Sequence, residues 1–338
     1  MSPRRDRHDR LDEDDVRVRP GRGNSRPRSK ERPDHRGARA ATVVAVDRGR
    51  FTIELGPGTA DDAVEGYAVK ARELGRKGIV VGDRVDVAGD GAATIDDPVR
   101  IVRRHERTST LRRTADDTDP VERVVVANAT QLVVVTATAD PEPRTGLIDR
   151  ALVAALDAGI HPMLVVTKAD LHPADDLLAL YEPLGVPAFV VANKQVPDGL
   201  REVLAGEETV LLGHSGVGKS TLVNGLVPDA DRLTGRVNAV TGRGRHTSTS
   251  VVALHLPGGG LIVDTPGIRS FGLAHVDAAR IVEAFDDLAD LTADCPRACS
   301  HDEPDCALTA ALASAPPDLA ARIDSLQRLL RSRADSDY

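Results

Sequence analysis

A phosphate-binding loop is the clearest chemical pattern in this sequence, because residues 213–220 match GxxxxGK[ST]. Glycines in such a loop let backbone N–H groups close around a β-phosphate, and Lys219 would reach the β- and γ-phosphates. Ser220 would bind Mg²⁺, and the helix that follows would present its N-terminus to the anion. The alternative is an ordinary glycine-rich turn, but the segment lies between an apolar strand pattern and a helical one. The predicted nucleotide contacts here are Gly213, His214, Ser215, Gly216, Val217, Gly218, Lys219, Ser220 and Thr221.

The tetrapeptide DTPG at 264–267 follows the apolar run LIV, one strand pair after the phosphate loop. Asp264 in that place suits a water-mediated hold on Mg²⁺, and the Gly267 amide suits the γ-phosphate. By itself DTPG is a common turn. After a phosphate loop it predicts the second half of a magnesium–nucleotide site.

The tetrapeptide TKAD at 167–170 would select the purine base, because it is similar to the guanine-selecting NKxD signature. Asp170 would accept hydrogen bonds from N1–H and the exocyclic amine of guanine, which adenine cannot reproduce. The methylenes of Lys168 would cover the base plane, and Thr167 stands where the signature has Asn. A helix-initiating turn is the alternative. However, TKAD ends a buried strand pattern, and ligand loops of α/β sheets gather at strand ends.

The order of these motifs is unusual for a GTP-binding domain. No Lys follows Lys219, so a downstream NKxD motif cannot exist. The rival segment Asn193-Lys194-Gln195-Val196 has Val where the carboxylate must be. The guanine loop therefore precedes the phosphate loop, which requires a circularly permuted domain.

All three cysteines lie within 12 residues of one another, together with one histidine. Three thiolates and an imidazole complete a tetrahedral zinc shell, and a shell with no open position indicates a structural metal. A redox cluster is the alternative. The predicted zinc ligands are Cys295, Cys299, His301 and Cys306.

Taken in order, these segments resemble the RsgA (YjeQ) family of GTPases that depend on the small ribosomal subunit. The resemblance covers about residues 39–310 and rests on the segments TKAD, VVANK, GHSGVGKST, GRGRHTSTS, DTPGIRSF and the Cys/His knot. It implies a second base-contacting loop at Ala192 and Asn193. It also implies Mg²⁺-dependent hydrolysis of GTP to GDP and phosphate, stimulated by the ribosome, during late maturation of the small (30S) subunit. Its partner would be that subunit and its rRNA.

A switch loop is expected in the glycine-rich segment 241–250, between the phosphate loop and DTPG. Thr247, or else Thr249, would bind Mg²⁺ and sense the γ-phosphate. Ile268 stands where many GTPases place a water-orienting Gln, and an aliphatic side chain cannot orient water. His246, which resembles the histidine of the family's GRHT segment, is the predicted catalytic replacement. A solvent-facing loop histidine is the alternative.

Several elements must position these residues. Short β-like runs punctuated by Gly, Asp and Pro predict an RNA-binding OB-fold barrel over 39–105, with an SH3-like barrel as the alternative. Continuous Val/Leu strands alternating with helices then predict a mainly parallel sheet covered on both faces. The predicted organisation is a multidomain α/β protein. It comprises a disordered basic arm (1–38), the barrel (39–105), a linker (106–125), a permuted GTPase domain (126–272) and a zinc-knot helical domain (273–338).

Composition narrows the functional class. The formal net charge is −8, yet residues 1–40 hold 13 Lys or Arg against 8 Asp or Glu. A basic arm on an acidic body suits contact with RNA, although a solvated disordered tail has the same composition. The sequence shows no secretory signal and no membrane-length apolar run, and its odd, clustered cysteines argue against a disulfide framework. A cytoplasmic monomer is therefore expected.

Two other classes of function fit parts of the sequence. An ATP-using P-loop kinase would share the phosphate loop, but Asp170 and DTPG disfavour it. The other class is a non-enzymatic RNA-binding scaffold whose affinity for RNA depends on the bound nucleotide. It is favoured if Ile268 means that GTP turnover is negligible. Nucleotide competition separates the first from a GTPase, and single-turnover hydrolysis separates the second.

Overall fold

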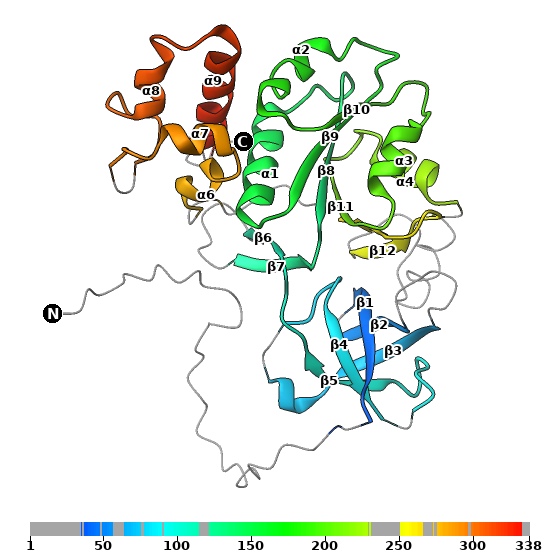
Figure 1. Ribbon diagram of the computed structural model, residues 1–338. Helices are drawn as coiled ribbons and strands as arrows, with labels where there is room; N and C mark the ends of the chain where they lie inside the picture. Colours follow the sequence, from blue (N-terminus) through cyan, green and yellow to red (C-terminus); the bar gives the residue numbers. More distant parts are fainter. Residues whose placement is uncertain are drawn as a thin grey trace, which may run out of the picture.

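The computed structural model describes residues 35, 37–47, 49–56, 64–75, 78–89, 91–114, 122–228, 230, 251–265, 273, 276–296 and 299–332. Most of the predicted disordered arm (1–38) and all of the expected switch loop (241–250) lie outside these residues. The described chain forms a small barrel, an α/β domain and a cluster of C-terminal helices (Figure 1).

Five strands form the barrel, in the order β1-β2-β3-β5-β4, and pairing of β1 with β4 closes it. The barrel core follows strand alternation, since Val43, Ile53, Val85 and Ile101 point into it and are fully buried. Val44, which points the other way, is buried in the core of the α/β domain. This confirms the predicted OB-like domain. The strands are β1 (Arg39–Asp47), β2 (Arg50–Leu55), β3 (Val64–Lys70), β4 (Arg84–Ala88) and β5 (Val99–Arg104).

The α/β domain contributes six strands in the order β10-β9-β8-β11-β13-β12, and only the edge strand β12 runs antiparallel to its neighbour in this domain. This mainly parallel sheet confirms the fold expected from the alternating strands and helices. The strands are β8 (Gln131–Ala137), β9 (His161–Thr167), β10 (Ala188–Val190), β11 (Glu208–Leu212), β12 (Val252–His255) and β13 (Leu261–Asp264).

The parallel sheet is covered on both faces, as Figure 1 shows for α1 on one side and α3 and α4 on the other. Successive residues of β8 are buried in two different hydrophobic cores. Leu132 and Val134 pack with α1, whereas Val133 and Val135 pack with α3 and α4. This two-sided burial explains the uninterrupted apolar run in the sequence. The helices are α1 (Thr145–Asp157), α2 (Asp175–Leu178), α3 (Asp198–Leu204) and α4 (Lys219–Leu226).

The predicted linker (106–125) contains most of a two-stranded ribbon, β6 (Thr110–Thr114) paired with β7 (Glu122–Ala127). The ribbon continues into tight contact with the barrel, because a Cβ atom on Gly82 would lie 2.0 Å from the Ala127 carbonyl oxygen. The side-chain amide of Asn128 also donates to the Gly82 carbonyl at 2.7 Å. Nearby, Arg107 pairs at 2.7 Å with the fully buried carboxylate of Asp83. The connection between barrel and α/β domain is therefore braced by specific contacts.

The C-terminal helices pack on the α1 side of the sheet (Figure 1). In the predicted helical domain (273–338), two short helices are separated by a turn at 283–285. A longer helix follows, and its residues Ile323, Leu326 and Leu330 are buried at helical spacing. The helices are α6 (Ala278–Val282), α7 (Asp286–Leu291), α8 (Ala307–Leu312) and α9 (Pro317–Ser332).

Two arginines of α9 hold the segment between α2 and β10. Arg328 donates to the Leu180 carbonyl at 2.9 Å and to the Asp149 carboxylate of α1 at 3.2 Å. Arg322 donates to the Pro183 carbonyl at 2.7 Å and pairs with Asp287 of α7. Helix α9 is thus fixed to the α/β domain by directional bonds as well as by apolar packing. Among the described residues, no helix is long and apolar enough to cross a membrane.

Candidate nucleotide-binding site and metal centre

The predicted nucleotide-site motifs meet at the carboxyl ends of neighbouring parallel strands. The chain runs from β8 to β9 on one side, and β11 and β13 lie on the other side of β8. Such a reversal of strand order creates a crevice in which ligands of α/β sheets bind. TKAD follows β9, the phosphate loop follows β11, and Asp264 ends β13. The upstream guanine loop and the downstream phosphate loop therefore share one edge of the sheet.

The phosphate loop needs glycine at specific positions. A Cβ atom on Gly213 would lie 2.6 Å from the Val135 carbonyl oxygen, so only glycine fits where the loop leaves β11. Gly218 has φ of +87° immediately before α4, a conformation that other residues avoid. Ser220 and Thr221 lie exposed in the first turn of that helix. Backbone and side-chain donors thus surround one space, which fits a phosphate group.

Lys219, the first residue of α4, forms an ion pair with Asp264 at the end of β13. The Lys219 ammonium lies 2.5 Å from Asp264 Oδ1 and also donates to the Thr265 carbonyl at 3.0 Å. Both side chains are mostly shielded, with 12% and 24% exposure respectively. Thr265 is itself fixed, because its hydroxyl donates to the Leu211 carbonyl at 2.7 Å. A cation, a carboxylate and the Ser220 hydroxyl in one crevice are a donor set that fits Mg²⁺ with a polyphosphate.

The two predicted base loops are tied together. The Asn193 backbone N–H donates to Asp170 Oδ1 at 2.9 Å, and Ala192 lies just before it in the same loop. Lys168 has a positive φ of +57°, and its ammonium donates to the Asp140 carbonyl. The second carboxylate oxygen of Asp170 receives no hydrogen bond from any described residue that the structure records. That oxygen can accept from a guanine edge.

Thr167 lies behind the base loop and is only 4% exposed. Its hydroxyl is 2.5 Å from the Val217 carbonyl of the phosphate loop and 3.1 Å from the Thr136 carbonyl. A hydroxyl carries one proton, so these two acceptors share a single donor, and the shorter distance favours Val217. Thr167 therefore connects the base loop to the phosphate loop from within the protein.

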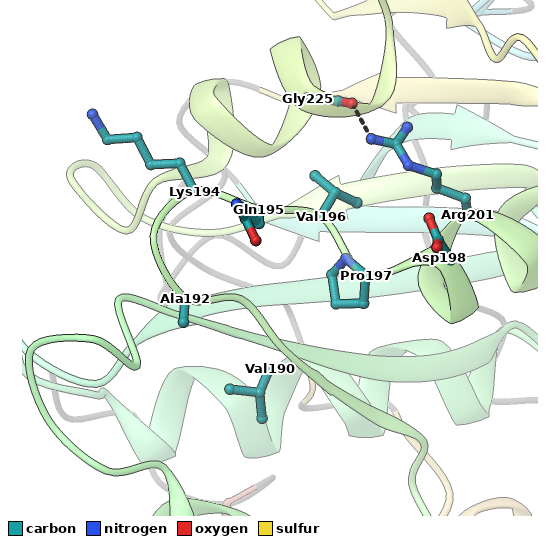
Figure 2. A pocket seen from close by; sticks show the side chains of 9 residues that line it. All are labelled: Val190, Ala192, Lys194, Gln195, Val196, Pro197, Asp198, Arg201 and Gly225. Atoms are coloured by element: carbon teal, nitrogen blue, oxygen red, sulfur yellow. Dashed lines mark hydrogen bonds between the residues drawn. The ribbon is translucent and has the colours of Figure 1, made fainter.

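A groove of about 680 Å³ lies beside the second base loop (Figure 2). No residue of the phosphate loop lines it, so it is separate from the phosphate space. In Figure 2 the Arg201 side chain of α3 reaches the last turn of α4, where it donates to the Gly225 carbonyl at 2.7 Å. This bond ties the helix after the second base loop to the helix after the phosphate loop. The lining residues are Val190, Ala192, Lys194, Gln195, Val196, Pro197, Asp198, Arg201 and Gly225.

Three predicted site residues fall outside the described part of the chain: the catalytic candidate His246, the Mg²⁺ candidate Thr247 and the γ-phosphate contact Gly267. Their roles remain predictions from the sequence.

The four predicted zinc ligands form one cluster, with their ligand atoms all within 4.8 Å of one another. Cys306 Sγ is 3.8 Å from both Cys295 Sγ and His301 Nδ1. Zinc–sulfur bonds of about 2.3 Å in a tetrahedron separate two sulfurs by roughly 3.8 Å. The distances from Cys306 therefore match those of a tetrahedral zinc site, and the whole cluster is close enough to bind one zinc ion.

Neighbouring groups hold this cluster in shape. His301 has φ of +64°, and its carbonyl accepts a hydrogen bond from the buried Gln327 amide of α9 at 3.0 Å. Burial, and then the hydrogen bond that Cys299 donates to Glu303, raises the pKa of Cys299 to about 12. The metal-free thiol is therefore protonated at neutral pH, and zinc binding would release that proton.

Sequence reasoning missed three supporting residues. The Thr138 hydroxyl donates to the Lys168 carbonyl at 2.7 Å, and the Asp140 carbonyl accepts from the Lys168 ammonium. Gln327 supports the zinc ligand His301 from 26 positions away. All three contacts involve a backbone carbonyl in a loop or turn, and no residue pattern in a single sequence reveals such pairings.

Comparison with known proteins agrees with this geometry. Residues 104–274 match the family described as RsgA GTPase, which is just over half of the chain. The chain belongs to the RsgA GTPase family. It is 43% identical over 224 residues to the "Small ribosomal subunit biogenesis GTPase RsgA" of Pseudomonas aeruginosa (strain LESB58), an alignment that covers 63% of this chain and 66% of the relative. The same-named protein of Pseudomonas syringae pv. tomato is 44% identical over 242 residues, with 68% of each chain covered.

Solved structures related to the RsgA family share the fold. YjeQ from Thermotoga maritima superposes with a TM-score of 0.59 at 24% identity, covering 87% of this chain and 99% of that one. YloQ, described as a circularly permuted GTPase, gives a TM-score of 0.60 at 22% identity, covering 88% of this chain and 97% of that one. The permuted order expected from the positions of Asp170 and Lys219 is thus matched by a solved structure of this fold whose description names a circularly permuted GTPase.

Proposed function

We propose that this protein hydrolyses GTP to GDP and phosphate with Mg²⁺. The observation that carries the proposal is the convergence of the guanine loop and the phosphate loop, joined by the 2.5 Å contact from Thr167 to the Val217 carbonyl. Family membership supports the same activity. Asp170, with one oxygen oriented by Asn193 and the other available, would select guanine over adenine.

Each predicted residue has a defined task in this reaction. The phosphate loop and Lys219 would bind the β- and γ-phosphates, while Ser220, Asp264 and Thr247 would hold Mg²⁺ directly or through water. Mg²⁺, when bound, neutralises phosphate charge. His246 would orient the attacking water, because Ile268 cannot. Without a partner the turnover is expected to be slow, on the order of 10⁻⁴ to 10⁻² per second.

The proposed partner is the small ribosomal subunit, contacted through its rRNA during late maturation. Support comes from the names of the relatives and from the OB-like barrel, a fold that binds oligonucleotides in many proteins. The predicted basic arm would add charge-based affinity for RNA. We further propose that the protein acts as a monomer in the cytoplasm, with one structural zinc ion at the Cys/His cluster.

Single-turnover hydrolysis of GTP, measured with and without small ribosomal subunits, tests this function. The expected result is slow intrinsic hydrolysis that subunits accelerate. His246→Ala should keep GTP affinity and lose most of the accelerated rate, whereas Lys219→Ala should impair nucleotide binding itself. Full acceleration with His246→Ala would remove the histidine from the mechanism, and equal competition by ATP would contradict guanine selectivity.

Ile268 favours a second candidate function, that of a nucleotide-gated RNA-binding scaffold with negligible turnover. In that case GTP and GDP would change the affinity for subunits, but bound GTP would remain intact through many binding cycles. The same single-turnover experiment distinguishes the two functions.

A further inference from the structure

The barrel and the α/β domain share one continuous sheet. Strand β1 of the barrel pairs with β12 at Ala45 and Val252, and Val252 is paired in turn with Asp264 at the end of β13. Asp264 lies 2.5 Å from the ammonium of Lys219. Two strand spacings, about 10 Å, therefore separate the barrel backbone from the predicted Mg²⁺ carboxylate.

A second contact fixes the same joint. His255, at the other end of β12, lies with Nε2 2.7 Å from Glu54 Oε1 on β2. Both side chains are mostly shielded, at 23% and 15% exposure, so water screens this pair less than an exposed one. We call the Ala45–Val252 bridge and the Glu54–His255 pair the barrel joint.

The position of β12 in the chain makes the joint relevant to hydrolysis. The strand begins at Val252, two residues after the segment 241–250 that contains His246 and Thr247. It then leads through a short turn into β13 and Asp264. A shift of β12 relative to the rest of the sheet would thus act on Asp264 through β13, and it would also move the point at which the predicted switch segment joins the sheet.

We propose that Glu54 and His255 are positioning residues that couple RNA bound to the barrel to GTP hydrolysis through β12. This inference rests on the proposed function and names how its partner regulates it. RNA that reorients the barrel would move β1, and β1 would carry β12 with it. Coupling of this kind is reciprocal, so GTP and GDP should also differ in their effect on RNA affinity.

The test compares small-subunit stimulation of GTP hydrolysis in the full-length protein and in Glu54→Ala and His255→Ala. Each variant should lose about tenfold or more of the stimulation while intrinsic hydrolysis and GTP affinity stay unchanged. The affinity for subunits should also become nearly equal with GDP and with a non-hydrolysable GTP analogue. The exchanged pair Glu54→His with His255→Glu should restore a large part of both effects.

Arg280→Gln is the matched control, because it breaks the 3.3 Å pair between α6 and Asp157 of α1 and leaves the joint and the barrel surface intact. This control should retain full stimulation. The inference is overturned if the joint variants keep stimulation, or if they weaken subunit binding equally in both nucleotide states. Failure of the proposed function looks different: the unmodified protein would then show no stimulation and no nucleotide-dependent subunit affinity.

Discussion

One carboxylate oxygen of Asp170 is bonded within the protein, and the other is proposed to bind guanine. One oxygen accepts the Asn193 N–H at 2.9 Å, and the other remains for the guanine edge. Asp170→Asn keeps an acceptor for Asn193 but removes the charge that strengthens the bonds to guanine. GTP affinity should fall by about ten- to a hundredfold, which corresponds to loss of a charge-assisted hydrogen bond. Xanthosine triphosphate, which has an oxygen in place of the amine, should gain affinity.

Competition binding with GTP, xanthosine triphosphate and ATP measures this change in preference. The control is Asp175→Asn, which changes another acidic residue, at the start of α2. It should leave all three affinities unaltered. An unchanged preference in Asp170→Asn would exclude the carboxylate from base selection.

The buried hydroxyl of Thr167 provides a second prediction at the scale of single residues. Thr167→Val keeps the shape but leaves the Val217 carbonyl without its short hydrogen bond. An unsatisfied buried polar group costs about 1–3 kcal/mol, so the free energy of unfolding should fall by that amount. GTP affinity should fall as well, because Val217 belongs to the phosphate loop.

Urea unfolding and nucleotide titration of Thr167→Val check both effects, with Thr167→Ser as the variant that keeps the hydroxyl. A full effect in Thr167→Ser would show that the methyl group, not the hydroxyl, carries the contact.

Motif spacing predicted that the base loop and the phosphate loop would meet, because loops after parallel strands lie at one edge of a sheet. It also predicted that three thiols and an imidazole within 12 residues would form one cluster. The inward orientation of Thr167 was beyond that reasoning. Whether a residue at the end of a strand faces the ligand or a neighbouring loop depends on how closely the two loops approach. That distance is set by packing of β8, β9 and β11, not by the tetrapeptide.

At the scale of elements, the zinc knot and α9 support each other through Gln327 and the His301 carbonyl. Cys299→Ser should therefore lower the thermal stability of the C-terminal helices, because it removes a metal ligand and with it a stabilising ion. GTP affinity should stay nearly intact, since the phosphate loop and α4 pack in the core on the opposite face of the sheet.

Metal analysis should find close to one equivalent of zinc in the unmodified protein and much less in Cys299→Ser. Zinc below about half an equivalent in unmodified protein purified without chelator would contradict the site. Ser300→Ala, beside the ligand, is the control and should retain the metal.

The Glu54–His255 pair predicts a pH dependence of the contact between barrel and β12. The hydrogen bond with Glu54 raises the pKa of His255 above its ordinary value of 6.5. The protonated form is therefore favoured in the folded state, and its contribution to stability is complete below pH 6.5 and is lost as the pH rises through the folded pKa. The stability difference between the unmodified protein and His255→Gln should shrink over that range.

Urea unfolding of both proteins from pH 5.5 to 8.5 measures this difference. A gap that widens as the pH rises would contradict the assignment of the charge to His255.

The types of the longer elements followed from apolar periodicity, but their connections did not. The segment 106–125 has few continuous apolar residues and was expected to be a linker, yet Leu111 and Val126 pair across β6 and β7 and are buried. These residues are buried by the barrel and α1 together, and no local pattern reveals a core shared by distant segments. The turn at 283–285 between α6 and α7 likewise lets both helices pack into the core that α1 and α9 share.

At the scale of the whole molecule, one apolar core joins the α/β domain to the C-terminal helices. Leu152 of α1 and Leu326 of α9 belong to the same cluster, and both are fully buried. Leu326→Ala should therefore reduce the free energy of unfolding by about 2–5 kcal/mol. Both regions should unfold in one transition, because neither has a separate core on that side.

Hydrogen exchange of α1 and α9 amides in Leu326→Ala checks this coupling, with Leu319→Ala as a milder change at a partly buried position of the same helix. Loss of protection confined to α9 would show that the two regions are independent folding units.

The shared core also has a consequence for biosynthesis. A ribosome makes α1 and the guanine loop first, the phosphate loop next and α9 only afterwards, since chains emerge from the N-terminus. During that interval the outer face of α1, which α9 later covers, has no permanent partner, and exposed apolar surface of this kind promotes aggregation. Each newly made molecule thus passes through a period in which it depends on chaperones or on rapid elongation. Slow codons placed between the stretches that encode α1 and α9 should lower the yield of soluble protein.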